Sequence, residues 1–220
     1  MIRVVLCDDS FLAREGIIRV LESIEDVELV GTCVDLEELR PVVERDKPDV
    51  ILTDIRMPPT YTDEGIRFAR ELRSSYPDVG VVVLSEHADP AYALALFENG
   101  SERRAYLLKE RVKDGDELAR ALREVVAGRS LVDPGIVDKL LPAQGGNDRG
   151  LERLTPREHQ ILEMISEGRS NNAIAETLMI TKRAVERHIN GIFLKLDLGD
   201  ASDVNRRVKA ALLYLAGEGG

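Results

Sequence analysis

The sequence predicts an α/β fold, a doubly wound five-stranded parallel sheet, followed by a small all-α domain of four helices. Over residues 1–127, short apolar runs alternate with amphipathic stretches five times. That alternation is typical of β–α units whose parallel sheet is covered by helices on both faces. Over residues 151–216 only helical patterns occur, separated by tight turns, which favours a separate helical domain.

The expected strands are continuous apolar runs rather than alternating ones, as in strands buried on both faces. They cover residues 4–7, 27–34, 50–52, 79–84 and 105–108. Each is followed by an amphipathic segment, and Asp89-Pro90 supplies a helix start, because Asp caps a helix and Pro suits its first position. The expected helices cover residues 11–21, 36–43, 66–72, 91–97 and 118–126.

Residues 128–150 are rich in glycine and proline, which predicts a linker, and Asp133-Pro134 indicates one short helix within it, through residue 141. The helical domain then begins at a capping box, Thr155-Pro156-Arg157-Glu158. Ser170 and Thr181 cap two further helices, and a fourth is expected over residues 201–215. We therefore expect three parts: residues 1–127, a linker at 128–150, and residues 151–220.

Charge and composition limit the possible classes of function. The net charge of −10 arises within residues 1–127, with 17 Lys and Arg against 27 Asp and Glu, whereas residues 151–220 hold ten of each. The helical domain could therefore present a basic face to nucleic acid. There is no apolar run long enough to span a membrane and no signal-peptide pattern at the start, so we expect a cytoplasmic protein without a membrane partner.

Two cysteines, Cys7 and Cys33, lie inside apolar runs. We expect buried core thiols in a reducing compartment, and a disulfide or redox pair is the alternative. Two cysteines and three scattered histidines provide no zinc-finger spacing.

Polar side chains follow four of the expected strands: Asp8-Asp9, Asp54, Ser85 and Lys109. In parallel α/β sheets these strand ends meet at one edge. Three nearby carboxylates repel one another and need a cation, and oxygen ligands of this kind suit Mg²⁺. Asp54 could then act as the nucleophile toward a phosphoryl group, which Mg²⁺ and Lys109 neutralise and to which Ser85 donates.

Each residue has a plainer alternative. The paired acids could cap the first helix, Asp54 and Ser85 could be turn residues, and Lys109 could be a solvated loop lysine; their joint occurrence at strand ends favours the site. The enzymatic alternative is a Mg²⁺-dependent aspartyl phosphatase. Such enzymes usually place the nucleophile after the first strand, with a second acid two residues later, whereas the isolated acid here follows the third strand. We therefore expect no enzyme.

Residues 1–127 resemble the receiver domain of two-component response regulators, which has a flavodoxin-like fold. The matching motifs are Asp8-Asp9, Asp54-Ile55-Arg56-Met57-Pro58, Ser85 after Val81-Val82-Val83-Leu84, and Tyr106-Leu107-Leu108-Lys109. The resemblance implies that Asp54 accepts a phosphoryl group from a sensor histidine kinase. It also implies a Mg²⁺ site formed directly by Asp9, Asp54 and the Arg56 carbonyl, and by Asp8 through water.

The same resemblance makes Ser85 and Tyr106 paired switch residues, with phosphate drawing Ser85 inward and Tyr106 after it; ordinary strand packing is the alternative for Tyr106. Two segments are longer than the common receiver pattern. Residues 58–65 lie beside Asp54, where we expect an effect on kinase recognition or phosphate lifetime. Residues 100–105 include Arg103 and Arg104 where small residues are common.

Residues 182–196 form an amphipathic helix with long polar donors opposite its apolar stripe. The polar face holds Lys182, Arg183, Glu186, Arg187, Asn190 and Lys195. Such side chains reach phosphates and base edges in a DNA major groove. A solvated helix surface is the plainer alternative, and His188 fits a packing role better than a metal-binding one.

Residues 151–216 resemble the LuxR-type helix-turn-helix of NarL/FixJ regulators. The matching motifs are Leu154-Thr155-Pro156-Arg157-Glu158, Gly168-Arg169-Ser170-Asn171, Ile174-Ala175, Val185-Glu186-Arg187-His188-Ile189 and Lys195-Leu196. The resemblance implies two sets of DNA contacts: bases are met by Glu186, Arg187 and Asn190, and phosphates by Ser170, Asn171, Lys182, Arg183 and Lys195. It implies double-stranded promoter DNA, a second copy of the chain in the active state, and RNA polymerase as partners.

One departure concerns Glu186, which stands where the family usually has Lys. A carboxylate near phosphates is repulsive unless it accepts from a cytosine amine or pairs with Arg183 or Arg187, so we expect weak non-specific affinity. Together the two resemblances predict a phosphorylation-controlled transcription factor. The main alternative is a regulator of the same architecture that uses no phosphorylation.

Overall fold

The structure is a computed structural model that describes residues 1–98, 100–113, 115–140, 150–198 and 203–218. Its first part is a parallel sheet with strand order β2-β1-β3-β4-β5-β6. The strands are β1 (Ile2–Cys7), β2 (Val27–Cys33), β3 (Val50–Asp54), β4 (Gly80–Ser85), β5 (Arg104–Leu108) and β6 (Leu131–Val132). The parallel α/β class is confirmed, but the predicted number of five strands is wrong.

The sixth strand, β6, extends the sheet beyond β5 with only two residues. Ala105 pairs with Leu131, and Tyr106 pairs with Val132. A two-residue apolar pair between a glycine and an Asp-Pro helix start carries no periodic pattern, so the sequence predicts a linker at this position. Because β6 lies within residues 128–150, the first part of the predicted linker belongs to the sheet.

Five helices cover the two faces of this sheet. They are α1 (Phe11–Glu22), α2 (Leu36–Asp46), α3 (Glu64–Ser75), α4 (Pro90–Phe97) and α5 (Gly115–Val126), and a 3₁₀ turn, η1 (Arg111–Lys113), precedes α5. Buried residues of α1 and α5 share one apolar cluster with one side of the strands, and residues of α2, α3 and α4 pack on the other side. Cys7 and Cys33 are register partners on β1 and β2, and both are buried free thiols, which confirms the core-thiol prediction.

The second part is helical, as predicted. It contains η2 (Leu151–Arg153), α7 (Pro156–Ser166), α8 (Asn171–Leu178), α9 (Lys182–Lys195) and α10 (Asp203–Glu218). The Thr155 capping box is present, and Ser170 and Thr181 accept from the first-turn amides of α8 and α9. The linker helix α6 runs over Pro134–Leu140; residues 141–149 and the predicted start of the last helix at 201–202 lie outside the described residues.

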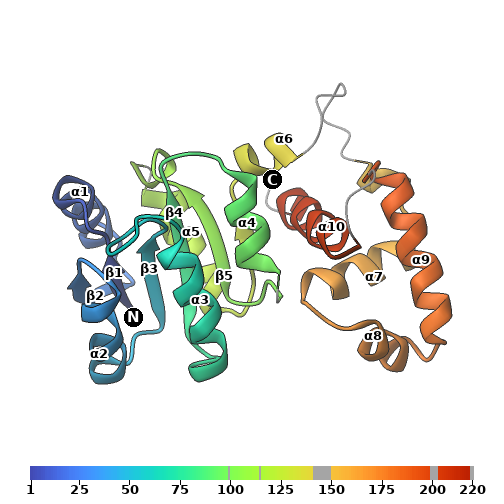
Figure 1. Cartoon of the computed structure of the whole chain (residues 1–220), viewed down its shortest axis with the longest axis horizontal. Helices are drawn as coiled ribbons and strands as arrows, with labels where there is room; N and C mark the ends of the chain where they lie inside the picture. The colour runs from blue at the N-terminus through green and yellow to red at the C-terminus, as the bar shows by residue number, and fades with distance from the viewer. Residues whose placement is uncertain (99, 114, 141–149, 199–202, 219–220) are drawn as a thin grey trace.

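Helix α10 packs on both parts of the chain. On one side it contacts α7 and α9, and on the other it contacts α4, α6 and β6, so that it lies between the sheet and the rest of the helical domain (Figure 1). Its buried residues include Val208, Ala211 and Leu212. They belong to a single apolar cluster that also contains Phe97 of α4 and Ile136 of α6.

The turns beside this interface meet backbone to backbone. Gly100 lies between α4 and β5, and Gly168 lies between α7 and α8; a Cβ atom on Gly168 would lie 2.7 Å from the Gly100 Cα. Both glycines have positive φ, a conformation that side-chain-bearing residues rarely adopt. The close approach of the two parts therefore depends on the absence of side chains here.

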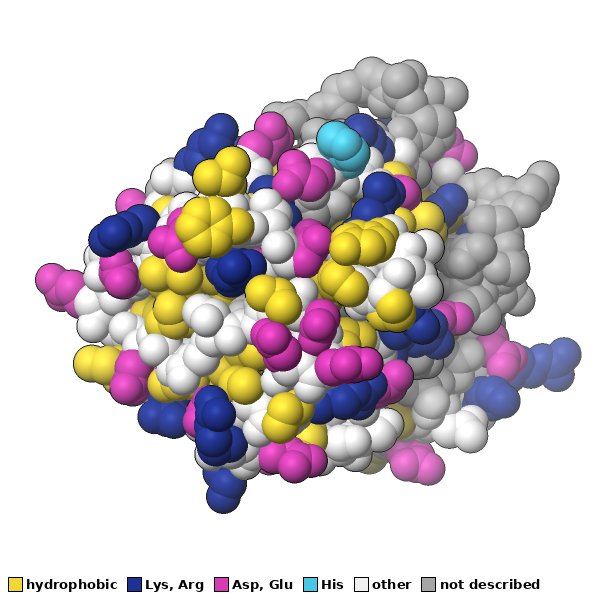
Figure 2. All heavy atoms as spheres, turned by 60° about the vertical axis from the view of Figure 1, so that its left-hand side comes forward, with side chains coloured by type: hydrophobic (Ala, Val, Ile, Leu, Met, Phe, Trp, Pro, Cys, Tyr) yellow, Lys and Arg dark blue, Asp and Glu magenta, His cyan; other side chains and the backbone are white. Residues whose placement is uncertain are grey.

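The opposite end of the molecule carries a mixed surface. Figure 2 shows basic, acidic and apolar side chains interspersed on the face that the first part turns away from the helical domain. Among the described residues, no helix combines the length and apolar character needed to cross a bilayer.

Candidate functional site

Three carboxylates meet at the carboxyl ends of β1 and β3. Asp8, Asp9 and Asp54 each place one oxygen atom within 4.8 Å of the others. Asp8 is fully buried and Asp54 nearly so, whereas Asp9 is only partly covered. Three acids on adjacent parallel strands repel one another, and their hard oxygen atoms match the ligands of Mg²⁺, so the donor set fits that ion.

Lys109 links two of these acids from the end of β5. Its Nζ lies 2.8 Å from Asp8 Oδ2 and 3.0 Å from Asp54 Oδ2, and Glu86 Oε1 lies 3.5 Å away. Burial acts to lower the pKa of Lys109, but Asp8 and Asp54 outweigh it and raise that pKa above the usual value. The ammonium therefore remains charged beside the acids.

Burial raises the pKa of Asp54, and Lys109 offsets only part of that rise. The two oxygen atoms have different partners, because Oδ1 accepts from the Ile55 amide at 2.7 Å and Oδ2 accepts from Lys109. A carboxylate held in this way beside an open cavity can reach an incoming group. A cavity of about 420 Å³ opens there, with Asp54, Arg56, Ser85 and His87 in its lining.

Ser85 lines the same cavity as Asp54, and within the described residues neither Ser85 nor Tyr106 forms a hydrogen bond with the Asp54 carboxylate. The Ser85 hydroxyl donates to the His87 carbonyl at 2.7 Å. Tyr106 is fully buried in the apolar cluster between β5 and α4, and burial raises its pKa to about 12. Tyr106 therefore occupies an inward position in this structure, and its pairing with Ser85 as a switch stays a prediction.

Glu64 organises the long loop beside the acids. Its side chain, 1% exposed, accepts from the amides of Thr60 and Thr62 at 3.2 and 2.9 Å and from the Thr60 hydroxyl. Burial acts to raise the pKa of Glu64, but these donors outweigh it and lower that pKa to about 2. The loop is thus wrapped around an ionised carboxylate.

Tyr92 of α4 joins this loop to the cavity. Its hydroxyl donates to the Thr62 carbonyl at 3.0 Å, and the Arg56 guanidinium lies over its ring, 5.6 Å from the centroid. Tyr92 and Arg56 both line the cavity beside Asp54. Neither Glu64 nor Tyr92 was among the predicted site residues.

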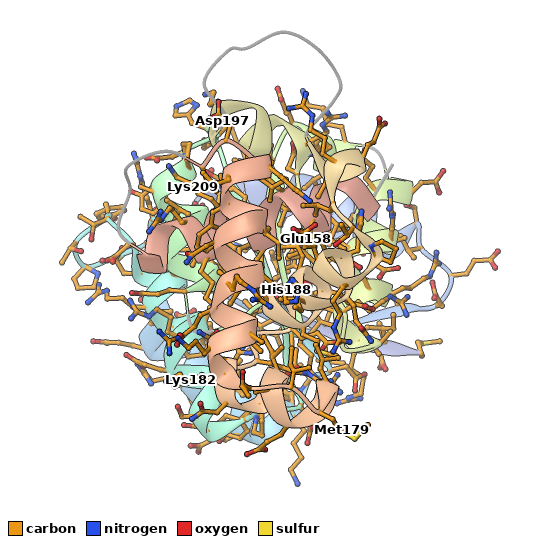
Figure 3. The ribbon with its side chains drawn as sticks, turned by 90° about the vertical axis from the view of Figure 1, so that its right-hand side faces the viewer. Glu158, Met179, Lys182, His188, Asp197 and Lys209 are labelled. Carbon is orange, nitrogen blue, oxygen red and sulfur yellow. The ribbon has the colours of Figure 1, made fainter. Side chains whose placement is uncertain are left out.

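The polar face of α9 is open to solvent. Lys182, Arg183, Glu186, Arg187 and Asn190 are all exposed. In Figure 3, which views the molecule from the side of the helical domain, α9 lies in front of the rest of the chain, with Lys182 and His188 labelled on it. The contacts between the two parts run through α10 and the turns at Gly100 and Gly168, so they leave the outer face of α9 uncovered.

Three of the predicted phosphate contacts already have partners within the domain. Lys195 Nζ lies 2.6 Å from Glu158 Oε2 in the capping box of α7. The side-chain oxygen Oδ1 of Asn171 accepts from Arg207 of α10 at 2.9 Å, and the Ser170 hydroxyl accepts from the Ala173 amide. These interactions hold α8 and α9 in place, whereas Lys182 and Arg183 remain exposed at the start of α9.

Comparison with known proteins matches both parts of the chain to families. Residues 4–123 match the response regulator receiver domain, and residues 152–208 match the bacterial regulatory proteins of the luxR family. The chain is similar to the transcriptional regulatory protein DegU of Brevibacillus brevis, with 33% identity over 90% of this chain and 89% of that protein. The chain is a response regulator of the NarL/FixJ type.

Two further comparisons support the assignment of this chain to the response regulators. The DNA-binding transcriptional activator DevR/DosR of Mycobacterium tuberculosis is 31% identical over 96% of this chain and 93% of that protein. A solved complex of the response regulator RcsB with DNA has a TM-score of 0.53 and 25% identity, and the match covers 97% of each chain. The acid cluster lies in the receiver domain of this response regulator, and the open face of α9 lies in its LuxR-type domain.

Proposed function

We propose that this response regulator is a transcription factor whose DNA binding is controlled by transfer of a phosphoryl group to Asp54. One observation carries the proposal: the Asp54 carboxylate lies with Asp8 and Asp9 within 4.8 Å and with the Lys109 ammonium at 3.0 Å. These groups are the ones that an acyl-phosphate acceptor needs: a nucleophilic carboxylate, two acids that can bind a metal ion, and an ammonium group. The assignments of residues 1–127, 128–150 and 151–220 to receiver, linker and DNA-binding domain belong to the same proposal.

In the proposed reaction, an Asp54 oxygen forms a bond to phosphorus while the bond from phosphorus to the kinase histidine nitrogen breaks. Asp9, Asp54 and the Arg56 carbonyl would hold Mg²⁺, with Asp8 bound through water. The bound ion supplies positive charge that neutralises the transferring phosphoryl oxygens. Lys109 pairs with one of those oxygens, and Ser85 turns from the His87 carbonyl to donate to another.

The change at Ser85 would then reach the helical domain. Ser85 ends β4 and pairs with Leu108 of β5, and β5 in turn pairs with β6. Because β6 and α4 both pack on α10, a shift in these elements would loosen the contact that holds α10. Release of α10 would allow two chains to pair and to place two α9 helices about one DNA turn apart.

Acetyl phosphate and Mg²⁺ test the proposal, with intact mass as the readout. We expect a gain of one phosphoryl group in the wild type, its loss in Asp54→Asn, and its retention in Asp78→Asn, which changes an exposed acid far from the cluster. Binding of promoter fragments, measured in parallel, should rise with phosphorylation only where the group is gained. A mass gain that persists in Asp54→Asn would contradict the assignment of Asp54.

A regulator that needs no phosphorylation is the second candidate. It is favoured by the open face of α9, which DNA could reach without any rearrangement. The same experiment separates the two, because this candidate requires equal DNA binding with and without the phosphoryl group.

A further inference from the structure

Glu186 is the one carboxylate on the outer face of α9 among the described residues. Residues four apart share a side of a helix, so that Lys182, Glu186 and Asn190 form one row and Arg183 and Arg187 form the next. All five side chains are exposed. A carboxylate at this position weakens the attraction between the neighbouring cations and DNA phosphates. Its presence therefore indicates a contact other than one with phosphate.

Intrahelical pairing does not explain Glu186. Lys182 and Arg183 are one turn before it and Arg187 is adjacent, yet Glu186 forms no ion pair or hydrogen bond with any other residue in the described part of the chain. Elsewhere in this domain a partly exposed acid does pair, as Glu167 does with Arg169 at 2.6 Å. The Glu186 carboxylate therefore remains available, with acceptor oxygens only.

We propose that Glu186 selects cytosine, by accepting a hydrogen bond from its exocyclic amine in the major groove. The inference rests on the proposed DNA-binding function and specifies which base that function reads. Thymine and guanine offer acceptors that repel a carboxylate, and the adenine amine lies beside the acceptor N7, whereas the cytosine amine has no acceptor of its own base beside it in the groove. Arg187, next along the helix, suits the O6 and N7 acceptors of guanine.

The position of Glu186 on α9 fits base contact better than phosphate contact. The N-terminal half of a recognition helix is the part that meets base edges, and Glu186 is the fifth residue of a helix that begins at Lys182. Asn190, one turn further, is a residue type that reads adenine with two hydrogen bonds. The row therefore places two different base readers one helical turn apart.

Selection from a pool of random double-stranded fragments tests the inference. The full chain is first incubated with acetyl phosphate and Mg²⁺, and the retained fragments are sequenced for the wild type, Glu186→Ala, Glu186→Gln and Glu152→Gln. The last variant makes the same charge change at an exposed residue of η2, outside α8 and α9. Retention of total DNA is measured for each protein.

We expect the wild type and Glu152→Gln to enrich cytosine at one position of each half-site. In Glu186→Ala, the enrichment of cytosine over the other bases at that position should fall about 10-fold, as expected for the loss of one base-specific contact. Glu186→Gln should replace cytosine with adenine, because an amide can both donate to N7 and accept from N6. Total DNA retention should not fall in either variant, since a charge that repels phosphates has been removed.

An unchanged cytosine preference in both Glu186 variants would overturn the inference and leave the proposed function intact. Enrichment of no sequence by any of the four proteins would instead contradict the proposed DNA-binding function. The two failures are therefore distinguishable within one experiment.

Discussion

Substitution of Gly168 by alanine tests whether the contact between the two domains restrains the regulator. Gly168 has φ of +81°, and its added Cβ would lie 2.7 Å from the Gly100 Cα. Carbon atoms pack best at about 3.5–4.0 Å. The Gly168→Ala variant must therefore separate the two turns by about 1 Å, which forfeits roughly a quarter to a half of the dispersion attraction across the gap.

A matched control separates this effect from local strain. Gly128 has φ of +84° and nothing within 4 Å of its added Cβ. Both glycines follow the end of a helix and make the same hydrogen bond there. The Gly128 amide donates to the Val125 carbonyl, and the Gly168 amide donates to the Ile165 carbonyl. Gly128→Ala and Gly168→Ala should each lose about 1 kcal/mol of stability from the unfavourable backbone conformation, and only Gly168→Ala adds the clash between domains.

Small-angle scattering and DNA binding, both without phosphorylation, provide the readouts. We expect Gly168→Ala to be more extended than the wild type and to bind DNA several-fold more tightly, while Gly128→Ala matches the wild type in both. If the two variants have the same scattering profile and the same DNA affinity, the contact at Gly100 does not restrain the helical domain. That result would refute the reasoning even if both variants are less stable.

Two further predictions concern the buried carboxylates of Glu64 and Glu158. Because the pKa of Glu64 is about 2 when folded and near its ordinary value of 4.5 when unfolded, its ionised form stabilises the fold above pH 4.5, and that contribution disappears as the pH falls toward 2. Glu64→Gln should therefore lower the free energy of unfolding by up to about 3 kcal/mol at pH 7, with a difference that shrinks in acid; a pH-independent difference in denaturant titrations would contradict this. Lys195→Gln should lower the thermal midpoint by removing the partner of Glu158, yet leave the salt dependence of DNA binding unchanged, whereas Lys182→Gln should reduce that salt slope by about one. A reduced slope in Lys195→Gln would instead support Lys195 as a phosphate contact.

Local patterns in the sequence predict most of the receiver fold and its acid cluster. Apolar runs mark the five long strands, and in a parallel sheet the residues that follow them converge at one edge, so the sequence predicts that Asp8, Asp54 and Lys109 lie together. The strand β6 could not be predicted from the sequence, because two residues are too few to show a repeating hydrophobic pattern. Its pairing with β5 depends on the path of the chain after α5, which no local pattern contains.

Glu64 and Lys195 show why side-chain roles were harder to predict. Glu64 begins α3 after a polar loop, and an acid at that position is usually solvated. Only the fold of residues 57–62 around it makes it a buried acceptor. Lys195 lies on a helix with a charged face, but its partner Glu158 is 37 residues away in sequence. Contacts over such separations follow from tertiary packing, which a single sequence does not display.

The linker provides the physical connection between the acid cluster and α10. The Tyr106 carbonyl on β5 accepts from the Asp133 amide at 2.9 Å, and the buried Asp133 carboxylate accepts from the Gly135 amide at 2.8 Å, at the start of α6. Ile136 of α6 is fully buried in the same apolar cluster as α10. A displacement of β5 would therefore shift α6 and loosen its contact with α10, while the outer face of α9 keeps its shape. Control in this regulator would then act on how two α9 helices are brought together, rather than on whether one of them is covered.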